Sequence, residues 1–260
     1  MAQKERLDVL VHERELAPSR EKARAIIMAG EVLVNGIEVT KPGAPTDIAA
    51  EITVKNKPQY VSRGGDKLAA ALSAFPIDVS ACICADVGAS TGGFTDCLLQ
   101  HGAAKVYALD VGYGQIALTL RDDPRVIVME RVNARHIDKL NEPVSLVVID
   151  ASFISLRLLL PVIKNWLTPQ AHLIPLIKPQ FEAGRRDVGK GGVVKDPKIH
   201  ARVLDEVLSF AQEIGFSTHG LIKSPIKGPA GNTEFLAWLS WEHPNLPSIP
   251  IPDLIKRVIQ

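Results

Sequence analysis

The strongest fold signal in this chain is the segment Ala85-Asp86-Val87-Gly88-Ala89-Ser90-Thr91-Gly92-Gly93-Phe94-Thr95-Asp96. Its pattern predicts a buried strand that reaches an acid, turns on glycine and leads directly into a helix. The free N–H groups at the start of such a helix can hold an anionic or polar ligand. We therefore expect a nucleotide-like ligand at this turn.

Alternating strand and helix patterns surround this segment. Apolar runs predict seven strands, at 82–87, 104–110, 126–130, 144–150, 171–177, 216–223 and 233–241, and helical patterns at 67–75, 93–101, 153–167 and 196–214 lie between most of them. This alternation is typical of a mostly parallel sheet that is covered by helices on both faces, as in Rossmann-like α/β folds. Only a Gly/Pro loop separates the last two runs, so we expect them to form an antiparallel hairpin at the sheet edge.

A smaller α+β unit is expected before this domain. Residues 6–16 have helical spacing, Ser19 can cap a second helix that Gly30 closes, and Asn35-Gly36 predicts a hairpin turn. Residues 55–66 are expected to be a linker. The proline-rich tail, with an amphipathic piece at 253–259, is expected to pack on the protein without a chemical role.

Composition excludes several classes of protein. The chain has 260 residues, is 46% hydrophobic and carries a net charge of +1, so disorder is not expected and any surface for nucleic acid must be a local cluster. No secretory signal is evident and no apolar run reaches the ~18 residues of a membrane span, so no membrane partner is expected. The three cysteines Cys82, Cys84 and Cys97 cannot all pair, which favours reduced thiols in a cytoplasmic protein.

The glycine spacing narrows the choice of ligand. Gly92-Gly93-Phe94 lacks the lysine of a P-loop, the glycines do not match G-x-G-x-x-G, and no kinase catalytic sequence accompanies them. The remaining candidate is a loop that binds S-adenosylmethionine, with Gly88 admitting the methionine part and Asp86 near its amino group or sulfonium. Taken alone, the segment also fits a plain strand–turn–helix.

Polar residues at the next two strand ends support a ligand site. Asp110 can accept hydrogen bonds from both ribose hydroxyls, and Asn133 can reach the adenine edge, because open α/β sheets bind ligands at the carboxyl ends of their strands. Each residue alone could be a solvated strand end. We predict cofactor contacts, and no metal site, at Asp86, Gly88, Ala89, Ser90, Gly92, Gly93, Phe94, Thr95, Asp110 and Asn133.

Four charged residues indicate the methyl acceptor. Lys67, Asp150, Lys178 and Glu234 lie at predicted helix starts and strand ends, and Lys178 in Leu176-Ile-Lys-Pro needs a partner if it is buried. Asp150 and Glu234 can supply one, although an ordinary solvent-exposed lysine is equally consistent with Lys178 taken singly. A lysine can stabilise a developing alkoxide and take its proton, while acids orient the ammonium groups. The set therefore favours a ribose 2′-hydroxyl as acceptor.

Methylation of a base is less consistent with the sequence. The Asn/Asp-Pro-Pro-aromatic sequence of enzymes that methylate base amino groups is absent after the fourth strand, where Asp150-Ala-Ser-Phe153 stands. Cys97 follows the glycine loop, which is the wrong side for a cysteine nucleophile, and is expected to be buried.

With these residues in view, the chain resembles the TlyA (haemolysin A) family of RNA 2′-O-methyltransferases over nearly its whole length. The first unit resembles an S4-type RNA-binding module through Arg6-Leu-Asp, Ser19-Arg20, Ala23, Ile27, Gly30 and Val32-Leu-Val-Asn35-Gly36. The second resembles an FtsJ-type methyltransferase through Val61-Ser-Arg-Gly-Gly-Asp-Lys-Leu68, Asp86 to Asp96, Asp150-Ala-Ser-Phe-Ile-Ser155, Leu176-Ile-Lys-Pro-Gln-Phe-Glu182 and Gly231-Asn-Thr-Glu-Phe235.

The resemblance implies an RNA-binding domain at 1–60, a methyltransferase domain at 61–245 and a tail at 246–260. It implies S-adenosylmethionine as donor and structured, ribosomal RNA as acceptor. It also implies that Lys67, Asp150, Lys178 and Glu234 form a catalytic Lys-Asp-Lys-Glu tetrad.

RNA contacts are predicted from local basic clusters. The predicted residues are Arg6, Ser19, Arg20, Lys22, Arg24, Asn35, Lys41, Arg63, Arg185 and Arg186. A solvated helix surface is the alternative in the first unit, whose charges balance. The glycine-rich loop 179–193, which also carries Lys190, is either a lid that orders on RNA or a flexible connector. A catalytically silent binding protein and a membrane-active haemolysin or cytotoxin are the two alternative functions.

Overall fold

The computed structural model describes residues 3–55 and 59–259. The chain divides into two compact units, Met1–Pro58 and Gln59–Gln260. Each unit has its own hydrophobic core and is described by itself.

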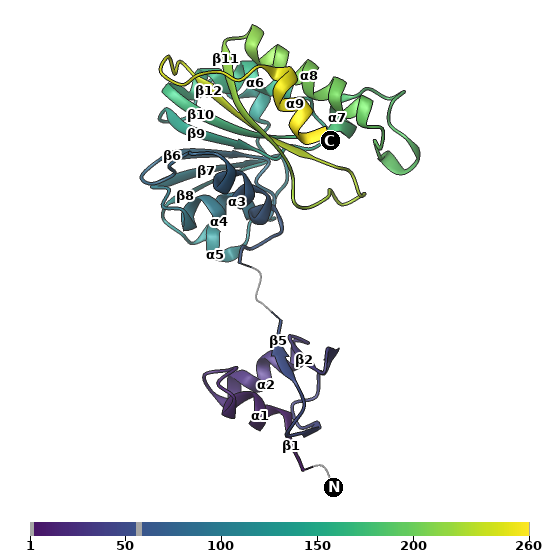
Figure 1. Ribbon diagram of the computed structural model, residues 1–260. Helices are drawn as coiled ribbons and strands as arrows, with labels where there is room; N and C mark the ends of the chain where they lie inside the picture. Colours follow the sequence, from purple (N-terminus) through teal and green to yellow (C-terminus); the bar gives the residue numbers. More distant parts are fainter. Residues whose placement is uncertain (1–2, 56–58, 260) are drawn as a thin grey trace. The chain divides into compact units, whose positions relative to one another are not determined.

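The first unit combines two helices with five short strands (Figure 1). Its elements are β1 (Lys4–Arg6), α1 (Leu7–Glu13), α2 (Arg20–Met28), β2 (Val32–Val34), β3 (Ile37–Glu38), β4 (Pro45–Asp47) and β5 (Ile52–Val54). Strands β3, β2 and β5 form one antiparallel sheet, and β1 pairs with β4. Leu7, Val11 and Ile27 are fully buried between the helices and β2.

The predicted helix cap, helix end and hairpin turn of this unit are all confirmed. Ser19 Oγ accepts the Lys22 N–H at the start of α2, and Gly30 follows the helix with a positive φ of 72°. Val34 pairs with Ile37 across the predicted Asn35-Gly36 turn. Strands β1, β4 and β5 were not predicted. Each has three residues, and no tight turn such as Asn35-Gly36 joins it to the strand with which it pairs.

The second unit contains the seven expected strands in one sheet. They are β6 (Ile83–Val87), β7 (Lys105–Asp110), β8 (Val126–Glu130), β9 (Val144–Ile149), β10 (Leu167–Ile177), β11 (Phe216–Lys223) and β12 (Phe235–Trp241), in the order β11-β12-β10-β9-β6-β7-β8. Pairing is parallel from β10 to β8, whereas β12 runs antiparallel to both β10 and β11. The expected Rossmann-like sheet with an antiparallel edge hairpin is therefore confirmed.

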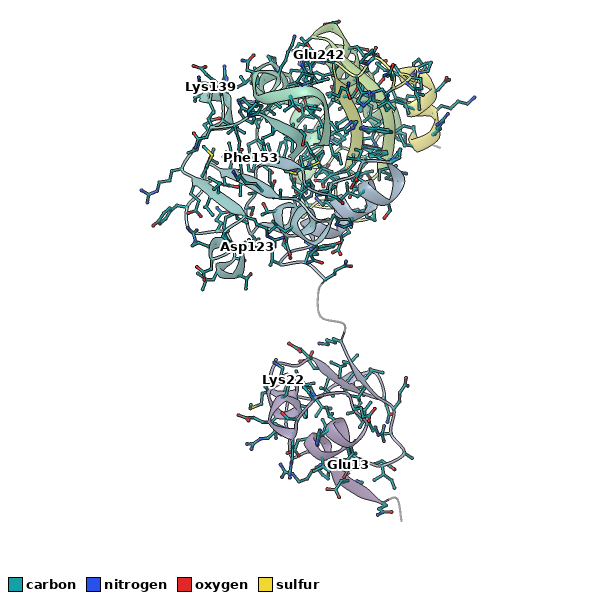
Figure 2. The ribbon with its side chains drawn as sticks, turned by 90° about the vertical axis from the view of Figure 1, so that its left-hand side faces the viewer. Glu13, Lys22, Asp123, Lys139, Phe153 and Glu242 are labelled. Carbon is teal, nitrogen blue, oxygen red and sulfur yellow. The ribbon has the colours of Figure 1, made fainter. Side chains whose placement is uncertain are left out.

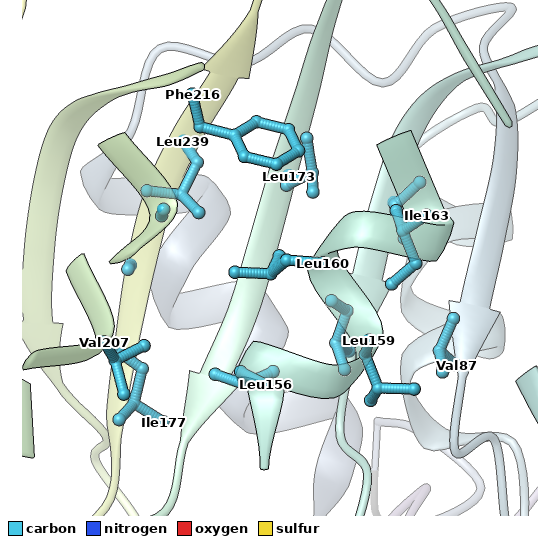
Figure 3. Close-up of a cluster of buried hydrophobic side chains, with 14 of the residues drawn as sticks. Val87, Leu156, Leu159, Leu160, Ile163, Leu173, Ile177, Val207, Phe216 and Leu239 are labelled. Atoms are coloured by element: carbon cyan, nitrogen blue, oxygen red, sulfur yellow. The ribbon is translucent and has the colours of Figure 1, made fainter. Parts of the chain in front are cut away.

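Helices cover both faces of this sheet. Figure 1 shows α6 (Leu156–Ile163), α8 (Pro197–Glu213) and α9 (Ile251–Ile259) on one face, and α3 (Gly64–Ala74), α4 (Gly93–Gln100) and α5 (Leu118–Arg121) on the other. On the first face, Leu160 and Ile163 of α6 belong to the same buried cluster as Leu173 of β10 (Figure 3). Short elements α7 (Pro179–Glu182), η1 (Ala134–His136), η2 (Lys164–Trp166) and η3 (Lys190–Gly192) complete the unit.

The expected linker at 55–66 is wrong over most of its length. Tyr60 is buried, the Val61 N–H donates to Asp96 Oδ2 at 2.8 Å, and α3 begins at Gly64. A Cβ on Gly65 would overlap the Tyr60 ring, so glycine permits this packing. Residues 56–58 of the expected linker lie outside the described residues. The tail packs as expected, since Leu254 and Val258 of α9 are buried.

Replacement of Leu160 by alanine tests the core between α6 and the sheet. Because Leu160 is fully buried, Leu160→Ala should lower the free energy of unfolding by about 2–5 kcal/mol, measured by chemical denaturation. Leu158, on the same helix but 44% exposed, is the matched control, and Leu158→Ala should change stability by no more than about 0.5 kcal/mol. Equal effects of the two substitutions would contradict this packing.

Candidate active site

The carboxyl ends of the parallel strands meet at one edge of the sheet. Gly88 directly follows β6 with a φ of 89°, and a Cβ there would lie 2.8 Å from the backbone oxygen of Asp150, after β9. The absence of a side chain at position 88 therefore allows the ends of β6 and β9 to approach each other closely. The sequence predicted an approach to a ligand and gave no sign of this contact within the chain.

Two glycine motifs place the first helices of the unit against each other. A Cβ on Gly93, at the start of α4, would lie 2.8 Å from the Gly65 backbone nitrogen and would overlap Ser62 Oγ. The starts of α3 and α4 therefore approach closely because both lack side chains there. This contact holds the first turn of α3, which carries Lys67, beside the glycine loop.

Four charged side chains form two ion pairs. Lys67 Nζ lies 2.6 Å from Glu234 Oε2, and Lys178 Nζ lies 2.6 Å from Asp150 Oδ1. Lys67, Lys178 and Glu234 are all at least nine-tenths buried, and the Asp150 side chain is 22% exposed. The partner that Lys178 was predicted to need is therefore Asp150, while Glu234 pairs with Lys67.

Neighbouring groups that the sequence did not single out hold these pairs. Ser152 Oγ accepts a hydrogen bond from Lys178 Nζ at 2.9 Å, and the Asp150 backbone oxygen accepts another at 3.3 Å. Gln180 Nε2 donates to Glu234 Oε1 at 3.4 Å. A Cβ on Gly228 would lie 2.5 Å from that same oxygen, so a glycine is required beside Glu234. These partners follow from tertiary contacts that no local pattern encodes.

Two adjoining cavities collect most of the predicted catalytic and cofactor-binding residues. The first, of about 450 Å³, is lined by the four charged side chains together with Gly88, Ala89, Ser90, Gly93, Phe94 and Arg63. The second, of about 630 Å³, is lined by Asp110 and Asn133 and shares Gly88, Ser90, Asp150 and Ser152 with the first. Asp86, Gly92 and Thr95 line neither of these two cavities.

Asp86 lies fully buried behind the glycine loop. Its Oδ2 accepts hydrogen bonds from the Thr95 backbone N–H at 2.9 Å and from Thr95 Oγ1 at 2.7 Å. Its Oδ1 is buried without a hydrogen-bond partner among the described residues. Burial raises the pKa of Asp86 to about 7 against the Thr95 hydrogen bonds, and the nearby charge of Asp150 adds to the rise. An additional donor or cation would satisfy Oδ1.

Asp110 and Asn133 already make local hydrogen bonds. Asp110 Oδ2 accepts the Ser90 N–H and Oδ1 accepts the Gly112 N–H, both at 2.7 Å. Asn133 Oδ1 accepts the Arg135 N–H at 3.0 Å. Each carboxylate oxygen of Asp110 retains acceptor capacity, and the Asn133 side-chain N–H groups have no part in that bond. Ser90 has a left-handed φ of 50°, which the Asp110 contact helps to hold.

An exposed aromatic side chain borders the second cavity. Phe153 is 90% exposed, has a positive φ of 63°, and its ring centroid lies 4.9 Å from that of Phe181 (Figure 2). In the sequence, Phe153 was noted only as part of the Asp150-Ala-Ser-Phe motif. A large apolar ring held in solvent at a site entrance can take a planar ligand group.

The basic residues predicted in the first unit are exposed, and two are held by one buried acid. Asp8, fully buried, accepts hydrogen bonds from Arg6 Nε at 2.9 Å and Arg20 Nε at 3.0 Å. Burial alone would raise the pKa of Asp8, but the bonds from Arg6 and Arg20 lower it overall. Lys22, Arg24 and Lys41 are exposed, whereas Ser19 Oγ and Asn35 Oδ1 accept backbone N–H groups of this unit.

The loop that follows Lys178 has two ordered ends. It begins with α7, whose Glu182 accepts hydrogen bonds from Ser155 Oγ and the Leu156 N–H at 2.6 and 2.8 Å. It ends at Val194, which is buried. Arg185, Arg186 and Lys190 are exposed between these ends.

The cysteines are free thiols in the structure. Cys84 and Cys97 are buried and Cys82 is half-buried. Burial raises the pKa of Cys97 to about 12, which agrees with the expectation that it is a packed side chain and not a nucleophile.

Known proteins resemble this chain in both sequence and structure. Residues 60–241 match the FtsJ-like methyltransferase family and residues 5–48 match the S4 domain. The Bacillus subtilis protein YqxC, whose name calls it a candidate rRNA methyltransferase, is 50% identical over 100% of this chain and 94% of its own length. The 16S/23S rRNA (cytidine-2′-O)-methyltransferase TlyA of Mycobacterium tuberculosis is 46% identical over 92% of this chain and 91% of that protein.

A solved structure extends the likeness to three dimensions. A Streptococcus thermophilus protein that carries a hemolysin name is 44% identical, covers 100% of this chain and 95% of its own, and superposes with a TM-score of 0.75. Together with the cavity geometry, these matches show the enzyme class and its cofactor. The chain belongs to the TlyA (haemolysin A) family of FtsJ-like, S-adenosylmethionine-dependent methyltransferases, and it carries an S4 domain at its amino-terminal end.

Proposed function

We propose that this enzyme transfers a methyl group to a ribose 2′-hydroxyl of ribosomal RNA, and that Lys67, Asp150, Lys178 and Glu234 activate the hydroxyl. The observation that carries the proposal is the pair of lysine–carboxylate contacts in a cavity that the glycine loop also lines. The name of the Mycobacterium tuberculosis relative supports the same class of acceptor. A ribosomal RNA substrate also implies action in the cytoplasm.

Lys178 is the proposed proton acceptor. Three acceptors surround Lys178 Nζ, namely Asp150 Oδ1, Ser152 Oγ and the more distant Asp150 backbone oxygen. As a neutral amine Lys178 has two N–H groups for the two nearer acceptors, and its lone pair can take the hydroxyl proton once the substrate replaces the weak third contact. Asp150 then stabilises the ammonium that forms. Lys67, oriented by Glu234, supplies positive charge beside the developing alkoxide. When bound, S-adenosylmethionine supplies an electrophilic sulfonium methyl group, whose bonding electrons return to sulfur on transfer.

The proposed cofactor contacts fit the chemistry of S-adenosylmethionine. Asp86 lines neither cavity, but its Oδ1 lacks a hydrogen-bond partner among the described residues, and its negative charge behind the glycine loop would favour a cationic amino group or sulfonium. Asp110 can accept ribose hydroxyls through its remaining lone pairs, and Asn133 can bond the adenine edge in the same cavity. Gly88 and Ser90 line both cavities, which suits a ligand that extends from one into the other.

The proposed RNA contacts of the first unit are exposed cations of its S4 domain. Asp8 holds the guanidinium groups of Arg6 and Arg20 while about half of each side chain stays exposed, at 50% and 53%. Lys22 and Arg24 lie on α2 with Arg20. Such ordered cations suit the phosphates of structured RNA, which is recognised largely through shape and backbone.

A membrane-active function has one observation in its favour, a relative's name. Hemolysin A of Brachyspira hyodysenteriae is 46% identical over 89% of this chain and 98% of that protein. Over residues 3–55 and 59–259, no helix has the length and apolar character needed to cross a bilayer. The paired charges in the cavity favour catalysis instead.

Replacement of Lys178 tests the catalytic proposal. Lys178→Ala should lower methyl transfer to ribosomal RNA by at least about 100-fold, because it removes the proton acceptor, while the dissociation constant for S-adenosylmethionine changes little. Tritium transfer to isolated ribosomal subunits and isothermal titration calorimetry measure the two quantities. Lys139→Ala, at an exposed lysine, is the control. Retained activity would refute the role of Lys178, and liposome leakage insensitive to the substitution would favour the membrane-active alternative.

The pH dependence of cofactor binding tests Asp86. Its pKa of about 7 means that the free protein carries a proton on Asp86 at lower pH, and only the ionised form attracts a cation. Affinity for S-adenosylmethionine should therefore fall about tenfold from pH 8 to pH 6, measured by calorimetry. Asp86→Asn should bind weakly and remove this dependence, whereas Asp138→Asn, at an exposed acid, should keep it. A wild-type affinity that is constant over this range would contradict the assignment.

The salt dependence of RNA binding tests the first unit. If Arg24 contacts one phosphate, Arg24→Ala should reduce the slope of log affinity against log salt concentration by about 0.9 and weaken binding several-fold at low salt. Fluorescence anisotropy with a ribosomal RNA fragment measures both. Lys256→Ala on α9 removes the same charge in the other unit and should leave the slope unchanged. An unchanged slope for Arg24→Ala would exclude this contact.

A further inference from the structure

Asn232 is a buried polar residue to which the mechanism above assigns no task. It is 2% exposed and stands two positions before Glu234. Its side-chain Oδ1 accepts the Val194 N–H and its Nδ2 donates to the Gly192 backbone oxygen, both at 2.9 Å. Residues 179–193, which carry Arg185, Arg186 and Lys190, are called the basic loop below. The Asn232 amide binds the end of this loop to the segment that carries Glu234.

Val194 is held from its other side as well. Its backbone oxygen accepts a hydrogen bond from His200 Nε2 at 2.9 Å, which requires the Nε2-protonated tautomer because a carbonyl only accepts. The His200 ring packs edge-on against Phe235, with centroids 5.6 Å apart. Asn232 and Phe235 flank Glu234, so the anchor of the loop contacts the chain on both sides of that carboxylate.

The other end of the basic loop begins at the second ion pair. Lys178 directly precedes α7, and the exposed Arg185, Arg186 and Lys190 lie between Lys178 and the Val194 anchor. A phosphate that binds these cations would therefore shift a segment that is joined to Lys178 at one end and hydrogen-bonded to Asn232, near Glu234, at the other.

The Glu234 carboxylate is held on two sides and has little room to move independently of this segment. Gly228, whose N–H donates to the Asn232 backbone oxygen at 2.9 Å, leaves no room for a Cβ beside Glu234 Oε1. Lys67 Nζ lies 2.6 Å from Glu234 Oε2 on the other side. A misplacement of about 1 Å in such a site can cost about 100-fold in rate.

We propose that Asn232 is a positioning residue that couples RNA binding by Arg185, Arg186 and Lys190 to the geometry of the Lys67–Glu234 pair. This inference rests on the proposed RNA methyltransferase function. It assigns the basic loop a second task besides affinity, which is to set the catalytic pair when RNA is bound.

A double-mutant cycle tests the coupling. The first variant is Asn232→Ala, the second is the triple Arg185→Ala/Arg186→Ala/Lys190→Ala, and the third combines them. Measurements are kcat and KM for methylation of ribosomal subunits, the dissociation constant for S-adenosylmethionine, and the melting temperature. Asn141→Ala, at an exposed asparagine, is the control for an amide truncation.

Coupling predicts a specific pattern of results. Asn232→Ala should lower kcat about tenfold or more while cofactor affinity stays within about twofold, and the combined variant should be no worse than the poorer of the other two. If Asn232→Ala does not fold, Asn232→Asp keeps the acceptor for the Val194 N–H, removes the donor to Gly192, and should give the same pattern.

Two results would overturn the inference. Effects of the variants that multiply, or an unchanged kcat in the folded Asn232 variant, would mean that Asn232 only stabilises the fold, and the proposed function would stand. A wild-type enzyme that transfers no methyl group to ribosomal RNA would overturn both the proposed function and the coupling.

Discussion

The burial of three charged groups at one edge of the sheet, with a fourth that is partly buried beside them, is the constraint on which this molecule depends. Moving an ion out of water costs several kcal/mol, and the loss of one partner from a buried pair typically costs about 3–5 kcal/mol. Lys67 pairs with Glu234 from the far end of the domain, and Lys178 pairs with Asp150 across neighbouring strands. Each pair forms only when the sheet order is correct, so the fold and the charged cavity depend on each other.

Small residues make these pairings sterically possible. Gly88 allows the end of β6 to approach Asp150, Gly93 allows α4 to approach α3, and Gly228 leaves room for Glu234. Gly88 and Gly228 lie against Asp150 and Glu234 themselves. Gly93 lies against the start of α3, the helix that carries Lys67. A methyl group at any of them would displace backbone or the carboxylate itself, so the glycine-rich motifs serve packing before they serve any ligand.

The sequence predicted the regular structure well because that structure depends on local patterns. Seven apolar runs became seven strands, and Ser19 caps a helix as its type and position predict. The need of Lys178 for a partner was also predictable, since it lies in an apolar run. Which acid it pairs with was not predictable, because that depends on strand order at the sheet edge.

The features that the sequence missed all depend on tertiary contacts. Tyr60 looked like part of a linker, and its burial follows from the absence of a side chain on Gly65. The buried amide of Asn232 joins two loops that lie 38 positions apart in the chain. The catalytic and cofactor-binding roles of the cavity residues stay predictions.

Both units hold cationic side chains with carboxylates, but the ratio of cations to carboxylates differs between them. In the first unit one buried carboxylate, Asp8, holds two arginines, which leaves a net positive charge on groups that are half exposed. In the cavity of the second unit two lysines face two carboxylates, and the set is mostly buried. With both lysines protonated the set has no net charge and attracts phosphate weakly. In the proposed mechanism Lys178 begins as a neutral amine, so the set begins at a net charge of −1 and becomes neutral when Lys178 takes the hydroxyl proton. This change of charge suits the proposed transfer of a hydroxyl proton, and the proposed attraction of RNA is left to exposed cations elsewhere, such as those held by Asp8 and those of the basic loop.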